Sequence, residues 1–296
     1  MICKILLTGA SGFIGKNFLS LCKKKNYQIL AISRKKQKNK ENVKWLKSDF
    51  GKLNLSHLNK IKEFQPKVII HLGWQDIPTF TKKVSEMNLK KSKNFLNNLI
   101  HLKSLKKIII TGSCFEYLKK QGSVNEKNKL DRISFLSKAK INLQLFSKKL
   151  CFANNKMFYW LRPFYIYGPY QRSDSLIPYL VKKILTNSKI QLNNPYKNLD
   201  YVYVDDVVKL IDLFVRQNIN EGIYNIGTGE KTSLIEIYNY LQLKIKKKYS
   251  LNKLSRTDYF ISNNNKLNKN IGKYKFINIT KGLDKYLLSL KKNDFS

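Results

Sequence analysis

The fold is decided by one short stretch near the start of the chain, TGASGFIG at residues 8–15. An apolar stretch at 2–7 precedes it and helical spacing follows over 13–25, which predicts a strand, a glycine-rich turn and a helix. Gly9 permits a tight turn, Gly12 removes a side chain where a pyrophosphate approaches the backbone, and Gly15 lets the helix pack closely. The N–H groups at the start of such a helix favour a phosphate. The stretch therefore predicts a dinucleotide-binding turn.

The end of the next expected strand, residues 28–32, bears on which dinucleotide binds. A carboxylate there pairs with a free ribose 2′-hydroxyl, but this chain continues Ser33-Arg34-Lys35-Lys36. A charge-assisted bond from Arg34 to a 2′-phosphate contributes about 1.5–3 kcal/mol. The sequence favours NADP as cofactor, with NAD as the alternative if Arg34 is one more solvated cation of a basic loop.

Further along the chain, apolar strands alternate with helical stretches. We expect strands at 68–72, 108–111 and 157–162, and helices at 84–101 and 136–152. This alternation predicts an α/β fold, a Rossmann-like doubly wound parallel sheet. From about residue 170 short strands, Asn-rich turns and two or three helices follow. We therefore expect a Rossmann domain at 1–168 and a smaller C-terminal α/β substrate lobe at 169–296, with some strands returning to the main sheet.

Composition limits the classes of function. The net charge is +38, but 51 of the 57 basic residues are lysines and they are scattered, which is more typical of solvated surface charge than of a nucleic-acid reader. No apolar run approaches the roughly 18 residues of a membrane helix, and no signal peptide is recognisable. The four cysteines are far apart, so we expect reduced thiols, no metal site and a cytoplasmic location.

Several further segments occur in the order of one known family. They are Ser48-Asp49-Phe50, His71-Leu72-Gly73-Trp74, Gly112-Ser-Cys-Phe-Glu-Tyr117, Arg162-Pro-Phe-Tyr-Ile-Tyr-Gly-Pro169, Asp200-Tyr-Val-Tyr-Val-Asp-Asp206 and Asn225-Ile-Gly-Thr-Gly229. With the glycine turn they resemble the extended short-chain dehydrogenase/reductase family, in its NAD-dependent epimerase/dehydratase branch. The resemblance covers nearly the whole chain and implies a nucleoside-diphosphate sugar as substrate.

The resemblance also implies roles for individual residues. Cofactor contacts are expected from Gly9, Ser11, Gly12, Phe13, Ile14, Gly15, Arg34, Asp49, Phe50, Leu72, Gly73, Asn88 and Lys138. Arg172 and Arg256 occupy positions that often hold substrate phosphates, and Arg162 and Asp206 are expected to be structural. A homodimer is a further expectation.

Catalysis in this family resembles a Ser/Thr–Tyr–Lys arrangement, in which the tyrosine moves a proton while nicotinamide moves a hydride. Ser113 and Lys138 match the first and last positions, but Ser134 stands where the tyrosine is expected. Tyr117 is the first candidate to replace it. Lys140 does not restore the motif, because Leu136 stands four residues before it.

Three hypotheses follow. The first is a reductase of nucleoside-diphosphate 4-keto-6-deoxyhexoses in surface-polysaccharide synthesis, which the NADP preference favours. The second is an epimerase or dehydratase on the same scaffold. The third is a catalytically weakened nucleotide-binding protein, which Ser134 favours and whose basic charge permits an RNA-binding variant.

Overall fold

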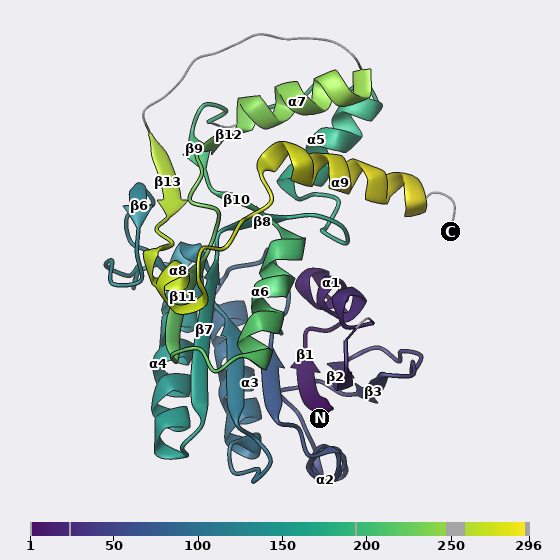
Figure 1. Cartoon of the computed structure of the whole chain (residues 1–296), viewed down its shortest axis with the longest axis vertical. Coiled ribbons are helices and arrows are strands. Elements are labelled where there is room, and N and C mark those ends of the chain that lie inside the picture. Colours follow the sequence, from purple (N-terminus) through teal and green to yellow (C-terminus); the bar gives the residue numbers. More distant parts are fainter. Residues whose placement is uncertain (1, 24, 193, 247–257, 294–296) are drawn as a thin grey trace. The chain divides into compact units, whose positions relative to one another are not determined.

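The computed structural model describes residues 2–23, 25–192, 194–246 and 258–293 (Figure 1). The chain forms two compact units. The first comprises Met1–Lys119, Lys129–Arg162 and Val208–Tyr224, and the second comprises Lys120–Asn128, Pro163–Val207 and Asn225–Ser296. The chain thus passes between the units several times, and we describe each unit by itself.

A seven-stranded sheet forms the framework of the first unit, in the order β11-β7-β5-β4-β1-β2-β3. The strands are β1 (Cys3–Thr8), β2 (Tyr27–Ser33), β3 (Val43–Lys47), β4 (Val68–His71), β5 (Lys107–Thr111), β7 (Met157–Pro163) and β11 (Gly222–Ile226). Neighbouring strands from β7 through β3 are parallel. The chain builds outward from β1 to β3 and then returns to add β4 on the other side of β1. The strand order therefore reverses beside β1, which is where such sheets bind ligands.

Helices cover both faces of this sheet. They are α1 (Phe13–Cys22), α2 (Leu55–Phe64), α3 (Lys82–Leu99), α4 (Phe135–Ala153) and α6 (Val204–Arg216). Successive residues of β7 show the two faces: Trp160 joins a core with Phe95 of α3 and Leu143 of α4, whereas the Tyr159 ring lies 5.2 Å from that of Phe214 in α6. The predicted doubly wound parallel α/β fold is confirmed.

The second unit is a smaller α/β assembly. Its sheets are β10 (Tyr201–Tyr203) with β8 (Tyr165–Tyr167), and the order β12 (Thr232–Ser233), β9 (Asn198–Leu199), β13 (Tyr259–Ser262), β6 (Gly122–Val124). Its helices are α5 (Leu176–Leu185), α7 (Leu234–Lys246), α8 (Asn265–Ile271) and α9 (Ile279–Asn293). Leu180, Leu241 and Leu283 from three of these helices meet in its core.

The elements that the sequence did not predict are short or half-polar. Strand β3 (VKWLK) alternates with lysines at the edge of the sheet, and β6 has three residues that pair with β13, far along the chain. Neither gives a clear apolar period. After residue 170 the described part of the chain has five helices, α5 to α9, rather than the two or three expected. No helix within the described residues is long and apolar enough to cross a membrane.

Candidate functional site

The glycine turn has the geometry that its sequence predicts. Gly9 has a φ of +70°, and a Cβ there would meet the backbone of Leu72 and Gly73 at 2.7–2.9 Å. A Cβ on Gly15 would overlap the carbonyl oxygen of Gly9. Gly12 differs, because its φ of −85° suits any residue and its Cβ would approach only the Gly9 oxygen, at 3.2 Å. Gly9 and Gly15 are therefore required by the fold, whereas at Gly12 the missing side chain leaves room for an incoming group.

Gly12 also begins helix α1, so Phe13, Ile14 and Gly15 form the first helical turn after it. No side chain caps this end of the helix. The backbone there is suited to receive an anion, because uncapped N–H groups and the helix dipole both favour negative charge.

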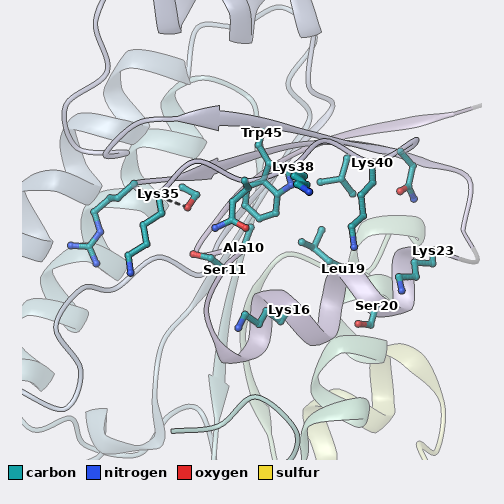
Figure 2. A pocket seen from close by; sticks show the side chains of 15 residues that line it. Ala10, Ser11, Lys16, Leu19, Ser20, Lys23, Lys35, Lys38, Lys40 and Trp45 are labelled. Atoms are coloured by element: carbon teal, nitrogen blue, oxygen red, sulfur yellow. Dashed lines mark hydrogen bonds between the residues drawn. The ribbon is translucent and has the colours of Figure 1, made fainter. Parts of the chain in front are cut away.

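A cavity of about 1050 Å³ opens beside the turn (Figure 2). Lys16 of α1 and Lys23, the residue after that helix, line it on one side, and Lys35, Lys38 and Lys40 come from the segment after β2. Its remaining lining includes Ala10, Ser11, Arg34 and Trp45, and none of its lining residues is an Asp or Glu. Six cations without a carboxylate make an electropositive site next to the predicted pyrophosphate position.

The segment predicted to hold an adenine is tied to its own neighbours. Asp49 accepts hydrogen bonds from Lys91 Nζ at 2.6 Å, from Gly51 N at 2.9 Å and from Gln75 Nε2 at 3.2 Å. Burial alone would raise the pKa of the Asp49 carboxyl. The hydrogen bonds and the charge of Lys91 lower this pKa by more than burial raises it, so the net shift is downward. Asn88 is fully buried and exchanges hydrogen bonds with the backbone of Gln75. In this structure Asp49 and Asn88 brace the loop that follows β4.

The ends of β1 and β4 are joined by buried polar groups. His71 Nδ1 lies 2.6 Å from Thr8 Oγ1 and His71 Nε2 lies 2.9 Å from Ser92 Oγ. Phe50 packs edge-on against the imidazole, with ring centroids 5.1 Å apart. Burial, and secondarily the charge of Lys140, lower the pKa of His71 to about 3, so the imidazole is neutral near pH 7. These contacts fix the strand ends on which Leu72 and Gly73 lie.

Ser113 lies at the end of β5, just before a short 3₁₀ helix at Cys114–Glu116. Its N–H donates to Glu116 Oε1 at 2.8 Å and its Oγ accepts from Phe115 N at 3.2 Å. Within the described residues its hydroxyl hydrogen has no acceptor. Ser113 is thus held in place with a proton left to donate.

Buried side chains beneath Ser113 hold this segment. Glu116 forms an ion pair with Arg162 at 2.7 Å, with both side chains fully buried, and also accepts from Trp160 Nε1. Arg162 in turn donates to the hydroxyl of Tyr117 at 3.2 Å and to Gln144. The Tyr117 ring has no exposed surface. Arg162 and Tyr117 therefore lie inside the core of the first unit.

Helix α4 places the remaining predicted catalytic residues. Ser134 is the residue that caps its start, exposed and outside the helical conformation, with its Oγ donating to Asp131 Oδ2 at 2.6 Å. Lys138 is exposed, and its side chain makes no hydrogen bond or ion pair with any residue that the structure describes. Neither side chain forms a hydrogen bond with Ser113 in the part of the chain that the structure describes.

Lys140 is the residue that motif matching passed over. It is buried, its Nζ donates to the carbonyl oxygen of Thr111 at 2.8 Å, and it lies 4.0 Å from the ring centre of Trp74. Burial lowers its pKa to about 8, and the charge of Glu116 partly offsets this shift. The sequence shows two lysines in this helix, but it does not show which of them faces the interior of the protein.

The second unit holds the predicted substrate residues and two buried aspartates. Arg172 is exposed and pairs with Asp174 at 2.9 Å, and Arg256 lies outside the described residues. Asp200 accepts hydrogen bonds from Thr228 and Ser262, and Asp206 accepts them from Tyr274 and Ile277. Both aspartates belong to the segment at 200–206, and both are buried with carboxylates that accept hydrogen bonds from other parts of the chain.

The sheet, its strand reversal and the glycine turn together define a Rossmann-type α/β fold with a smaller second unit. A sequence model of the NAD dependent epimerase/dehydratase family matches residues 5–227. The chain belongs to this family, whose members of the extended short-chain dehydrogenase/reductase type modify sugar nucleotides. The resemblance expected from the sequence is confirmed.

Individual relatives are distant but cover most of the chain. The CDP-abequose synthase of Salmonella muenchen is 26% identical over 249 residues, which are 81% of this chain and 80% of the relative. The dTDP-4-dehydro-6-deoxyglucose reductase of Escherichia coli is 27% identical over 82% of each chain.

Among solved structures, a UDP-glucose 4-epimerase from Thermotoga maritima with UDP-glucose superposes with a TM-score of 0.83 at 20% identity, covering 98% of this chain and 99% of the other. A UDP-glucuronic acid 4-epimerase from Bacillus cereus in complex with NAD gives 0.82 at 22%, with the same coverage. These likenesses show a shared fold.

Proposed function

We propose that this protein is an NADP-dependent oxidoreductase that reduces nucleoside-diphosphate 4-keto-6-deoxyhexoses for the synthesis of a surface polysaccharide. The observation that carries the choice of cofactor is the cavity at the end of β2, lined by six cations and no carboxylate. A 2′-phosphate is stabilised by such a lining, whereas the carboxylate partner of a free 2′-hydroxyl is missing. NADPH is consumed by reductions, while epimerisation returns its cofactor unchanged.

The residues present fit a dinucleotide. Gly12 leaves its backbone open where a pyrophosphate would approach, and the uncapped start of α1 offers N–H donors to it. Arg34 is proposed to bind the 2′-phosphate. When bound, this cofactor would supply a hydride to the sugar carbonyl.

Ser113 is proposed to orient the sugar carbonyl, because its amide and hydroxyl are fixed by Glu116 and Phe115 while its hydroxyl proton is free. Its donated hydrogen bond would stabilise the negative charge that develops on the carbonyl oxygen. Ser134 carries an aliphatic hydroxyl in place of a phenol, and the phenol of Tyr117 is buried and accepts a hydrogen bond from Arg162, so neither completes proton transfer. We therefore expect slow turnover, with the proton supplied through water. Arg172 remains a proposed contact of the substrate phosphates.

The named relatives support a sugar-nucleotide substrate. One acts on a dTDP-4-dehydro-6-deoxy sugar as a reductase, and another is a CDP-abequose synthase. A dTDP-D-glucose 4,6-dehydratase of Dictyostelium discoideum and an ADP-L-glycero-D-manno-heptose-6-epimerase of Brachyspira hyodysenteriae are also similar, at 26% and 25% identity, so dehydration or epimerisation is the second candidate reaction. A nucleotide-binding role with weak catalysis is the third, because the position of the family tyrosine holds Ser134.

The test is incubation of the protein with NADPH or NADH and a panel of nucleoside-diphosphate 4-keto-6-deoxyhexoses, followed by mass spectrometry of the sugar. Reduction adds two hydrogens to the sugar and yields an equal amount of oxidised cofactor. A sugar of unchanged mass but altered configuration would indicate epimerisation instead. Incubation with the corresponding unoxidised sugar nucleotides tests dehydration, which removes water. Binding of both ligands without turnover would favour the third candidate.

A further inference from the structure

Two lysines are buried among the described residues, and they differ in how their charges are satisfied. Lys107 donates to three backbone carbonyls, those of Phe214, Val215 and Gln217, at 2.6–3.3 Å. These acceptors use all three N–H groups of its ammonium. The ammonium of Lys107 therefore has all its hydrogen bonds satisfied by backbone carbonyls at the C-terminal end of α6.

Among the residues that the structure describes, Lys140 has one hydrogen-bond acceptor, the Thr111 carbonyl, and its Nζ also lies 4.0 Å from the ring centre of Trp74. A buried ammonium with unused donors is costly, because lysines are almost never buried without partners. The cation–π contact with Trp74 recovers part of this cost. The unused donors point to an acceptor other than the described part of the chain.

Trp74 adds a second unused donor at the same place. Its indole Nε1 is buried and has no hydrogen-bond partner within the described residues. Buried indole N–H groups normally find a partner. Two neighbouring side chains, the buried Lys140 of α4 and the half-buried Trp74 of the loop after β4, thus each keep a buried N–H donor that no described residue accepts.

The position of this pair in the sheet suggests which ligand supplies the acceptors. Thr111 is the last residue of β5, and Trp74 follows the end of β4 by three residues. A dinucleotide with its pyrophosphate over Gly12 at β1 and its adenosine toward Arg34 at β2 must extend its other half toward β4, because the strand order reverses there. The unused donors therefore lie on the nicotinamide side of the cradle.

We propose that Lys140 and Trp74, and not Lys138, bind the oxygens of the nicotinamide-side ribose and hold that half of the cofactor. Lys138 is four residues after Ser134, as the family motif requires, but it is exposed and makes no side-chain bond with the described residues. The cofactor-binding lysine of α4 is thus two residues later than the motif indicates. The position four residues before it, where the family has its tyrosine, is then Leu136 rather than Ser134. The inference rests on the proposed binding of a dinucleotide in this cradle.

The experiment compares two ligands by fluorescence titration or calorimetry. One is the whole cofactor, NADPH, with NADH in parallel. The other is its adenosine half, adenosine 2′,5′-bisphosphate, with 5′-AMP in parallel. The variants are Lys140→Met and Trp74→Phe, with Lys138→Met as the matched control. Trp74→Phe keeps an aromatic face and removes only the indole N–H, and Lys140→Gln guards against a folding defect in Lys140→Met.

We expect the affinity for the whole cofactor to fall at least about tenfold in Lys140→Met and severalfold in Trp74→Phe, because each loses a hydrogen bond to the ribose. Lys138→Met should change it less than about twofold. The affinity for the adenosine half should stay the same in all variants, which a general folding defect would not allow.

Two results would overturn the assignment in different ways. If the wild type binds the cofactor and the folded Lys140 variants bind it equally well, or if Lys138→Met alone is impaired, Lys140 has no part in binding and the proposed function still stands. If the wild type binds neither the cofactor nor its adenosine half, the proposed function fails, and this inference fails with it.

Discussion

The three glycines of the turn have separable roles that single substitutions can distinguish. Gly9 and Gly15 are packed closely against backbone, whereas a Cβ on Gly12 would meet a single backbone atom, the Gly9 oxygen at 3.2 Å, and its φ is ordinary. The sequence predicted all three from their spacing, since backbone approach and positive φ are requirements that only glycine meets at low cost. What the spacing did not reveal was which of the three positions is required by the fold and which leaves room for a ligand.

Gly12→Ala should remain folded and lose cofactor affinity, because its methyl group occupies the space in which the pyrophosphate approaches. Gly15→Ala should destabilise the protein by about 1–3 kcal/mol or more, because its methyl group overlaps the Gly9 carbonyl. Thermal unfolding and NADPH titration of both variants check this prediction. A stable Gly12→Ala with wild-type affinity would show that the ligand binds elsewhere.

Arg34→Asp should reverse the cofactor preference from NADP to NAD. The new carboxylate pairs with a free 2′-hydroxyl and repels a 2′-phosphate. The measurement is the ratio of the two dissociation constants, with Lys40→Asp as the control, since Lys40 lines the same cavity from six residues further on. Equal NADP affinity before and after Arg34→Asp would mean that Arg34 is merely solvated.

At the scale of elements, the sequence predicted best what is continuous and apolar. The Ile108-Ile-Ile run, the strand at 68–71 and the helix at 82–99 lie within two residues of their expected bounds. Helix α2 was missed because lysines and polar residues interrupt its apolar period, although Asn54 caps its start. Short pairings such as β6 with β13 depend on contacts between distant segments, which local patterns do not encode.

Helix α4 shows why part of the site was not predictable. Lys138 and Lys140 are two residues apart, so they lie about 200° apart around a helix and cannot both face the sheet. The motif favoured Lys138, but burial of the helix face with Ser137, Ile141 and Gln144 selects Lys140. Which face is buried depends on tertiary packing.

Restoring a phenol tests the register of α4 directly. Leu136→Tyr should raise the rate of sugar reduction by about 10²-fold or more, since it places the phenol four residues before Lys140 and Ser113 is already present. Overpacking at this half-buried position would cost about 1–3 kcal/mol of stability. Ser134→Tyr is the matched variant, and it should leave the rate unchanged because Ser134 is an exposed cap. If Ser134→Tyr raises the turnover and Leu136→Tyr does not, the catalytic positions are Ser134 and Lys138, as the motif indicates.

At the scale of the whole molecule, the charge of +38 requires no nucleic-acid partner. Much of this charge comes from lysines that are scattered along the sequence. The cavity beside the glycine turn, by contrast, is lined by six basic side chains and by no carboxylate. Association with anionic ligands should therefore be fast and should weaken with salt. The stability of the fold, by contrast, depends in part on one buried group that is neutral when folded, the imidazole of His71.

Acid should destabilise the fold through His71. Its pKa is about 3 in the folded protein and near 6.5 when unfolded, so the unfolded state binds an extra proton between these values. The free energy of unfolding should therefore fall as pH is lowered below about 6.5, by up to about 1.4 kcal/mol per pH unit from this group. Urea denaturation between about pH 7 and pH 5 measures the slope, which His71→Asn should reduce and His101→Asn, at an exposed position, should not. Equal slopes in all three proteins would remove His71 as the cause.

The most direct test of the proposed function follows the hydride itself. NADPH labelled with deuterium at the reactive carbon of its nicotinamide ring is incubated with the protein and a nucleoside-diphosphate 4-keto-6-deoxyhexose, and the sugar is analysed by mass spectrometry. We expect deuterium bound to carbon in the sugar, in an amount equal to the NADP⁺ formed, and no transfer with Gly12→Ala. Conversion of the sugar without deuterium, or tight binding of both ligands with no transfer, would contradict the account.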